Sequence, residues 1–332
     1  MASSNNKKLS ILYVLKVLQE FSDINHPLTQ SEIAKKIYSQ YGMECERKSI
    51  AYNIESLIDI GYDIVKAPTK GVYLGMREFE PSEITYLIDA VFSSKTLTSK
   101  QSQDLSNKLS SFLSSYDKKK YKYVYKSDEI NRTNNKQLFY NIDIINEAIE
   151  NNKQIKFTYN AYDINGNLKP KRDGKEYIVN PYFMINSCGK YYLVCNYDYY
   201  DEIANYKIEL ITNISLLDCP IKPVTELQGF KNGIDISKYI NEHIYMFTSP
   251  TVTAKLKVYS ESSLTQIFEC FGKNARAYKD GDGLYAMVTA EEDSLIYWCV
   301  QFGDIVELIE PQSTRNEIKK IINKLKDKYG ES

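Results

Sequence analysis

Residues 29–60 have the sequence TQSEIAKKIYSQYGMECERKSIAYNIESLIDI, which decides the architecture of the N-terminal region. Thr29 and Glu32 have the spacing of a capping box, so a helix is expected to begin here and to end at Gly42. Another helix is expected from Arg47 to Ile60. The apolar side chains of its expected inner face recur at helical spacing and are Ile50, Ile54, Leu57 and Ile58. Two successive helices of this kind predict a helix-turn-helix.

The segments on either side complete a small domain. Residues 8–21 carry apolar side chains near a period of 3.6, which predicts a helix in front of the pair. Residues 62–74 hold two short apolar runs around the turn at 68–71, which predicts a β-hairpin. Three helices and a hairpin are the layout of a winged helix-turn-helix, which we expect over residues 1–76.

The helix that begins at Arg47 has the composition of a DNA-recognition helix. Polar and cationic side chains near the N-terminus of a helix with an apolar inner face suit the major groove. The DNA-contacting candidates expected on its outer face are Arg47, Lys48, Ser49, Tyr52 and Asn53. Lys66 and Lys70 of the hairpin are candidates for contacts with the phosphate backbone. Residues 1–75 carry nine Lys and Arg against eight Asp and Glu, so protein binding stays an alternative to binding double-stranded DNA.

Residues 77–136 differ in character from the segment before them. Pro81 is expected to open a helix with apolar residues at helical spacing, and a second helical stretch follows around Leu105 and Leu109. A polar run then extends from Asp117 to Asn135. This pattern predicts a helical connector that ends in a flexible or extended link.

The rest of the chain predicts two further folded regions. Residues 137–222 begin with a helix, after which a period of two and closely spaced turns predict a small β-barrel. Residues 223–250 are expected to form a linker. Residues 251–330 alternate in the order β-α-β-β-α-β with a terminal helix, which predicts a ferredoxin-like domain. The expected fold class is therefore multidomain α+β.

The composition excludes several classes of protein. The formal net charge of -1 gives the whole chain no strong attraction to nucleic acid, so contacts with DNA must come from local patches. The six cysteines form no CxxC pair and there are two histidines, so no metal and no cofactor is expected. No run approaches the ~18 apolar residues of a membrane span, and the N-terminus resembles an amphipathic helix more than a signal peptide. These features predict a cytoplasmic protein with reduced thiols.

An enzyme is not expected. A nuclease or phosphodiesterase would need a carboxylate cluster for a metal ion or an acid–base pair. Asp198, Asp201 and Glu202 are close together in the sequence, but tyrosine-rich turns are commonly acidic.

The middle of the chain resembles the WYL-domain family. Residues 189–194, GKYYLV, are similar to its Trp-Tyr-Leu signature, with Tyr191 in place of the tryptophan. Residues 155–159, IKFTY, resemble its first strand, and Pro181-Tyr182 resembles the segment before the signature. Residues 206–211, YKIELI, stand at the position of an Arg-x-Asp-Arg-Ile-like motif, with Lys207 and Leu210 in place of its arginines. The winged helix and the C-terminal region, with VQFG at 300–303, resemble the usual companions of that domain.

The resemblance implies a ligand-responsive transcription regulator whose WYL domain is a small Sm-like or SH3-like barrel. It also implies a homodimer, because helix-turn-helix proteins commonly read two half-sites. The implied ligand is a nucleotide or single-stranded nucleic acid, whose bases would stack on aromatic rings while cations meet its phosphates. The candidate ligand-binding residues are Tyr159, Lys171, Arg172, Tyr182, Tyr191 and Lys207. A solvated hairpin tip and tyrosines that only pack are the alternative for the same residues.

Overall fold

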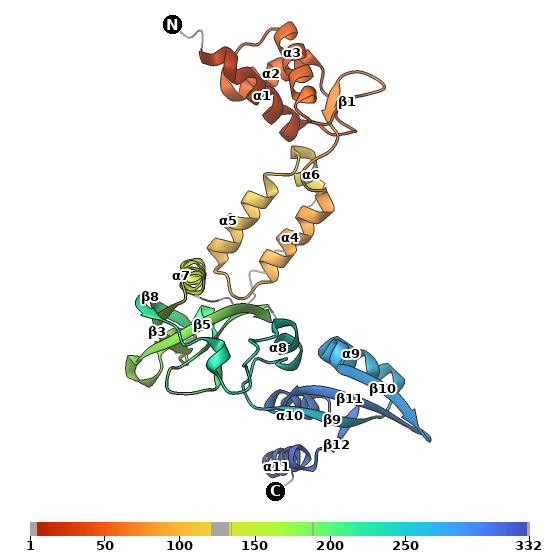
Figure 1. Ribbon diagram of the computed structural model, residues 1–332. Coiled ribbons are helices and arrows are strands. Elements are labelled where there is room, and N and C mark those ends of the chain that lie inside the picture. The colour runs from red at the N-terminus through yellow and green to blue at the C-terminus, as the bar shows by residue number, and fades with distance from the viewer. Residues whose placement is uncertain (1–4, 121–132, 134, 188, 331–332) are drawn as a thin grey trace. The chain divides into compact units, whose positions relative to one another are not determined.

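The computed structural model describes residues 5–120, 133, 135–187 and 189–330. The chain forms two compact units, Met1–Arg132 and Thr133–Ser332 (Figure 1). Both units are separately folded and the chain combines helices with several sheets, so the expected multidomain class with mixed helices and strands is confirmed. Within the described residues, no helix is long and apolar enough to cross a membrane.

The first unit begins with three helices and a hairpin, drawn in red and orange in Figure 1. These elements are α1 (Asn5–Phe21), α2 (Gln30–Tyr41), α3 (Arg47–Asp59), β1 (Ile64–Lys66) and β2 (Val72–Leu74). The predicted capping box at the start of α2 is confirmed. The Glu32 amide donates to Thr29 Oγ1 at 3.3 Å, and the Thr29 amide donates to Glu32 Oε2 at 2.8 Å. The three helices bury one apolar core, in which Val17, Leu18 and Ile50 have no exposed surface.

The hairpin is joined to the chain just before α2. The Leu28 amide donates to the Val72 carbonyl, and the Val72 amide donates to the Leu28 carbonyl, both at 2.8 Å. Gly71 lies against this junction with a φ of +95°, and a Cβ there would be 2.7 Å from the Leu28 carbonyl carbon. Only glycine combines this backbone conformation with so close an approach.

The third helix departs from its prediction at its end. It stops at Asp59, and Ile58 is 43% exposed, so the prediction that Ile58 is buried is wrong. Ile50, Ile54 and Leu57 are buried along one side of α3. Ile58 lies about 100° further around the helix than Leu57 and so leaves that side.

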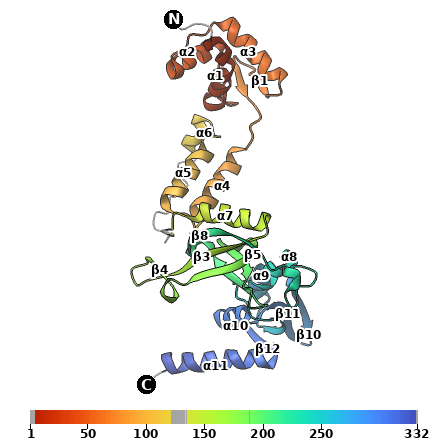
Figure 2. The same cartoon turned by 60° about the vertical axis from the view of Figure 1, so that its left-hand side comes forward.

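The connector consists of α4 (Pro81–Ser93), α5 (Ser99–Ser110) and α6 (Ser115–Lys120). α4 and α5 lie side by side in both views (Figures 1 and 2). Arg77 joins this region to α1, because its guanidinium donates to the carbonyls of Gln19 and Ser22 at 2.7 Å each. The polar run expected to be extended is helical over Ser115–Lys120, which corrects that expectation. Residues 121–132 and 134 lie outside the described residues.

The second unit begins with α7 (Leu138–Glu150) and a curved sheet. Its strands are β3 (Lys153–Tyr162), β4 (Leu168–Pro170), β5 (Glu176–Ser187), β6 (Lys190–Asn196), β7 (Ile203–Lys207) and β8 (Ile211–Pro220). They are joined in the order β4-β3-β5-β6-β7, and β8 also pairs with β3. A 3-10 turn, η3 (Ile208–Leu210), connects β7 to β8. α7 packs on β3, β5 and β8, as Figure 2 shows.

The segment at 223–250, expected to be a linker, is packed against this sheet. It contains η4 (Val224–Glu226) and α8 (Ile236–Glu242). Leu227, Tyr239 and Met246 are buried in one cluster with Tyr192 and Val194 of β6. The Asn205 amide group donates to the Met246 carbonyl at 3.1 Å, so this segment is held by both apolar and polar contacts.

The C-terminal region has the predicted order of strands and helices. Its elements are β9 (Thr251–Val258), α9 (Leu264–Phe271), β10 (Ala275–Asp280), β11 (Gly283–Glu291), α10 (Glu292–Gln301), β12 (Val306–Glu310) and α11 (Gln312–Tyr329). The antiparallel strands lie in the order β10-β11-β9-β12. α9 and α10 bury one side of the sheet, with Trp298 of α10 packed on Phe271 of α9.

Candidate functional site

The outer face of α3 carries most of the residues predicted to contact DNA. Arg47, Lys48 and Ser49 are exposed in its first turn, and Tyr52 is 70% exposed. Lys66 at the end of β1 and Lys70 in the hairpin turn are also exposed. Of the seven residues, six are therefore accessible to a ligand of the first unit.

Asn53 corrects the prediction. It is only 7% exposed, and its Nδ2 donates to Ser10 Oγ of α1 at 2.8 Å. Positions 50, 53, 54 and 57 follow the i, i+3, i+4, i+7 spacing of one helix face. Asn53 therefore lies within the apolar side of α3 and joins α3 to α1, so it does not reach the outer face.

In the second unit, Tyr159 of β3 lies between two of the predicted cationic residues. The Lys171 Nζ lies 5.5 Å from the centroid of the Tyr159 ring. The Lys207 amide donates to the Tyr159 hydroxyl oxygen at 3.4 Å. Burial raises the pKa of Tyr159 to about 12, so the phenol keeps its proton at neutral pH.

Further aromatic rings surround Tyr159. The Tyr206 ring lies 4.8 Å from it, nearly perpendicular, and the Tyr177 ring lies 6.2 Å from it. Phe157, at 1% exposure, packs below Tyr206 with 5.3 Å between centroids. The Tyr197 and Tyr206 hydroxyls are hydrogen-bonded to each other. Edge-to-face packing of this kind fixes the rings in place.

Two further lysines lie near Lys207, which approaches these rings through its backbone amide. Burial is the main cause that lowers the pKa of Lys207, and the nearby charges of Lys190 and Lys171 lower this pKa further. Like charges this close favour a bound anion, which would stabilise the charged form of Lys207. We call Tyr159, Tyr206, Lys171, Lys190 and Lys207 the tyrosine–lysine cluster.

Glu209 is the acidic neighbour of this cluster. It is 6% exposed, and burial raises its pKa although the charges of Lys207 and Lys190 act in the opposite direction. Among the described residues, no hydrogen-bond partner reaches its Oε2. A half-satisfied buried carboxyl beside crowded lysines is costly, and such arrangements concentrate at functional sites.

Sequence reasoning missed Lys190, Tyr206 and Glu209 as site residues. The feature that could have indicated Lys190 is the pairing of β6 with β7, in which Tyr192 lies opposite Lys207. Lys190 and Tyr192 share a face in an extended strand, so this register brings Lys190 toward Lys207.

Strand register relates Tyr191 to the rings of the cluster, and charge relates Arg172 to Tyr197 beside them. Leu193 pairs with Tyr206, so strand alternation puts Tyr191 on the face of β6 that matches Tyr206. Tyr191 is half-exposed, whereas its neighbour Tyr192 is buried at 8% exposure on the other face. Arg172 is exposed, and its charge acts on the hydroxyl of Tyr197.

The sheet that carries this cluster matches a known family. The family model of the WYL domain matches residues 140–216. The chain contains a WYL domain. The matched region runs from α7 to β8 and includes Tyr159, Lys190, Lys207 and Glu209.

Two solved structures are similar to this WYL-domain chain. Proteasome accessory factor B/C (PafBC) of Arthrobacter aurescens has 14% sequence identity and a TM-score of 0.29, over 99% of this chain and 49% of that chain. A CRISPR Cas-related protein has 15% identity and a TM-score of 0.39, over 99% of this chain and 87% of that one. The chain thus spans about half the length of PafBC. No curated protein matches it.

Tyr182 lies apart from the tyrosine–lysine cluster, which corrects its prediction as a member of the same pocket. A register shift between Pro181 and Phe183 interrupts the pairing of β5 with β6 at this residue. The Tyr182 hydroxyl is bonded to Asn196 Oδ1 and to the Lys222 carbonyl, both at 2.9 Å. Its neighbours line a separate, mostly apolar cavity of about 470 Å³, with Phe183, Ile221 and Val224 in its wall.

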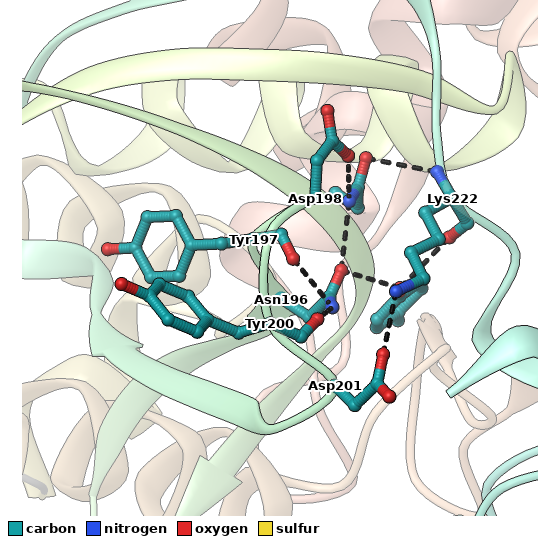
Figure 3. A network of polar contacts seen from close by, with 8 residues as sticks. Asn196, Tyr197, Asp198, Tyr200, Asp201 and Lys222 are labelled. Atoms are coloured by element: carbon teal, nitrogen blue, oxygen red, sulfur yellow. Dashed lines mark hydrogen bonds and ion pairs between the residues drawn. The ribbon is translucent and has the colours of Figure 1, made fainter. Parts of the chain in front are cut away.

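The hydrogen bonds of Tyr182 to Asn196 and Lys222 connect it to a polar network, part of which is labelled in Figure 3. Buried Asn180 donates to Asn196 Oδ1 and to Asp198 Oδ1, both at 2.8 Å. Lys222 pairs with Asp201 at 2.8 Å, as Figure 3 shows. Asp198 and Asp201, considered above for catalysis, are therefore engaged in structural contacts. Across the described residues, no group of three or more His, Cys, Asp or Glu could hold a metal ion.

Three buried asparagines hold the turn that follows Lys207. Asn135 Nδ2 donates to the carbonyls of Glu209 and Ile211 at 3.0 and 2.8 Å. Asn141 of α7 donates to the Ile211 carbonyl at 2.9 Å, and Asn160 of β3 donates to the Leu210 carbonyl at 2.8 Å.

We call Asn135, Asn141 and Asn160 the asparagine clamp. All three are at most 4% exposed. Asn135 lies in the stretch through which the chain enters the WYL domain from the connector. The clamp therefore fixes that entry point to the turn that carries Glu209.

Proposed function

We propose that this WYL-domain protein is a transcription regulator that binds double-stranded DNA through α3 and the hairpin and responds to an anionic ligand at the WYL domain. One observation carries the proposal. The first turn of α3 presents Arg47, Lys48 and Ser49 to solvent, while the opposite side of the same helix is packed into the core of a three-helix unit. A helix supported in this way is suited to the major groove.

The proposed DNA contacts divide by position. Arg47 and Lys48 reach guanine edges or phosphates, and Tyr52 meets phosphates or thymine methyl groups. Lys66 and Lys70 of the hairpin contact the phosphate backbone of the DNA. The proposed finer fold is a winged helix-turn-helix, an Sm-like barrel and a ferredoxin-like C-terminal domain, in a cytoplasmic homodimer that reads two half-sites.

The tyrosine–lysine cluster is the proposed ligand site. A nucleotide or a short single strand offers both the flat base and the phosphate that half-exposed Tyr191 and the three lysines require. Lysine binds phosphate as a compact charge and lacks the planar pair of N–H donors that arginine presents. Lys207 at the position of a motif arginine therefore supports contact with a phosphate rather than bidentate reading of a base.

The clamp offers a route from the ligand to the DNA-binding unit. A ligand that neutralises Lys190 and Lys207 changes the balance of charge around Glu209, whose carbonyl is held by Asn135. A shift of this turn displaces the entry segment and thereby the end of the connector. The largest possible response equals the difference in ligand affinity between the two arrangements.

The DNA-binding proposal is tested by selecting sequences from random duplex DNA with the purified chain. We expect a palindromic site, and we expect Arg47→Ala with Lys48→Ala to weaken its binding by about 10-fold or more. The matched control is Lys100→Ala with Lys108→Ala, which removes two exposed charges from α5. Equal affinity of the parent and the α3 variant at physiological salt would refute the assignment of α3.

An alternative is a protein-interaction module that uses the winged helix as a protein contact. The near balance of charge in residues 1–75 favours it. The two functions differ in their response to salt, because phosphate contacts lose affinity steeply as ionic strength rises. Capture of a partner that resists both salt and nuclease, without a selected DNA site, would support the alternative.

A further inference from the structure

Among the described residues, no helix covers one side of the C-terminal sheet, and this side carries aromatic and cationic residues. Ala254, Leu256, Ala286 and Val288 have no exposed surface and form the side beneath α9 and α10. Residues between them in the strands point to the other side. We call this other side the open face, and its residues used here are Lys255, Lys257, Arg276, Tyr278 and Tyr285.

Strand register brings these residues together. Tyr285 of β11 pairs with Tyr278 of β10 on one flank and with Lys257 of β9 on the other. Lys255 pairs with Met287, one step along the same face. The two tyrosine rings are 5.8 Å apart between centroids and inclined by only 25°. The Lys255 Nζ lies 4.5 Å from the centroid of Tyr285 and 6.0 Å from that of Tyr278.

The Tyr285 ring lies along its own strand over Gly283. A Cβ at position 283 would be 2.6 Å from Tyr285 Cε2 and 2.9 Å from its hydroxyl oxygen. Because the glycine leaves this space open, the ring can lie low against the backbone and turn its other side outward. Glycine in a strand commonly marks such a close approach.

We propose that the open face binds single-stranded nucleic acid. Two nearly parallel rings offer successive stacking platforms for bases, and Lys255, Lys257 and Arg276 offer positive charge for the phosphates between them. An antiparallel four-stranded sheet with aromatic residues on its face is a known geometry for this chemistry. A duplex hides the base faces, so the rings select an unpaired strand.

Two glutamates of β12 lie beside this face, Glu307 opposite Lys257 and the exposed Glu310 opposite Lys255. Glu307 of β12 forms an ion pair with Arg315 and accepts a hydrogen bond from the Tyr259 hydroxyl. Its charge is thus already compensated within the fold. The proposal rests on the contacts within the C-terminal sheet, and it does not depend on whether α3 binds DNA.

The test measures binding of fluorescently labelled oligothymidine and oligouridine to the full chain by anisotropy. Loss of one stacking platform lowers affinity by about 5- to 150-fold, so we expect this range for Tyr285→Ala and for Tyr278→Ala. Tyr285→Phe keeps the ring and is expected to bind as the parent does. The two oligonucleotides distinguish a DNA strand from an RNA strand as the natural source of this chemistry.

Two further variants separate binding from folding. Lys255→Ala should reduce the slope of log affinity against log salt by about 0.7, the value for one phosphate contact on a single strand. Gly283→Ala retains every ring and every charge but fills the space beneath Tyr285. It should weaken oligonucleotide binding while circular dichroism and thermal melting stay those of the parent.

The location of the bound strand decides between this site and the WYL domain. Photocrosslinking with 5-iodouridine should label Tyr278 or Tyr285. If Lys171→Ala with Lys207→Ala abolishes binding while Tyr285→Ala and Gly283→Ala bind as the parent does, the open face is not the site and the proposal is overturned. The same applies if no oligonucleotide binds, or if the strand crosslinks only to α3.

Discussion

The tyrosine–lysine cluster and the open face are built from the same residue types in different settings. In the WYL domain, Tyr159 and Tyr206 pack edge to face, and Phe157 below them is almost fully buried. On the C-terminal sheet, Tyr278 and Tyr285 lie nearly parallel on a surface without a helix over it. The rings of the first arrangement mainly pack against one another, whereas the rings of the second are proposed to stack with bases.

The lysines differ in the same way. Lys207 is crowded by Lys190 and partly buried, which lowers its pKa, whereas Lys255 lies over two rings. Crowded cations need a compact anion to neutralise them, while cations spread along a strand suit an extended polymer. The comparison teaches that burial, more than residue type, decides which anion each group would select.

The largest expected effect tests whether the two sets of rings differ in their contribution to the free energy of unfolding. Phe157→Ala should lower the free energy of unfolding by about 3–5 kcal/mol, because a fully buried ring leaves a cavity. Tyr278→Ala should lower it by about 1 kcal/mol or less, since this ring is not part of the core. Chemical denaturation of both variants gives the comparison. Equal losses would mean that the open face is itself a packed surface.

A smaller effect concerns the connection of each group to the rest of the chain. Asn135→Ala removes two hydrogen bonds to the turn beside the cluster. The variant should still bind the WYL ligand and the selected DNA site, but the ligand should no longer change DNA affinity. Such couplings are typically worth about 1–3 kcal/mol.

The control for coupling is Tyr285→Ala on the open face. It should retain the full response of DNA affinity to the WYL ligand, as titrations with and without that ligand would reveal. A response that survives Asn135→Ala would remove the clamp from the proposed route.

The smallest expected effect is a pH dependence at Glu209. Its raised pKa means that the folded chain binds this proton more tightly than the unfolded chain. The stability contributed by this group is present below the ordinary pKa of Glu and is lost as pH rises through the raised pKa. The parent should therefore become less stable relative to Glu209→Gln over that interval.

Urea denaturation of the parent and Glu209→Gln across this pH range checks the sign. Glu202→Gln, at an exposed carboxylate, is the matched control and should show no comparable trend. A parent that gains stability relative to Glu209→Gln as the pH rises would contradict the burial of an ionisable Glu209.

Local patterns in the sequence predicted the parts of the fold that local chemistry controls. The capping box at Thr29 and the order of elements after residue 251 were both confirmed, because hydrogen-bonding caps and apolar periodicity act over a few residues. The sequence predicts a linker at 223–250 because the apolar residues of this segment are too widely spaced to show a period. Leu227 and Met246 reach the core through tertiary packing alone.

The site was harder to predict because it depends on pairing between strands. A polar residue such as Asn53 can occupy an apolar helix face when one partner, here Ser10, satisfies it. Tyr182 was misplaced because a bulge reverses the side on which later residues point. Lys190 joins Lys207 through the register of β6 and β7, which no local pattern specifies.

The junction at Gly71 has a consequence for specificity. Backbone bonds between Leu28 and Val72 join the wing to the residue that precedes α2, and the missing side chain at Gly71 permits this contact. These two hydrogen bonds hold the hairpin against the segment before α2 and so restrict the movement of Lys70 relative to the helices. In the proposed complex with DNA, a hairpin held in this way would tolerate little variation in groove width, so DNA shape as well as base identity would govern which sequences are bound.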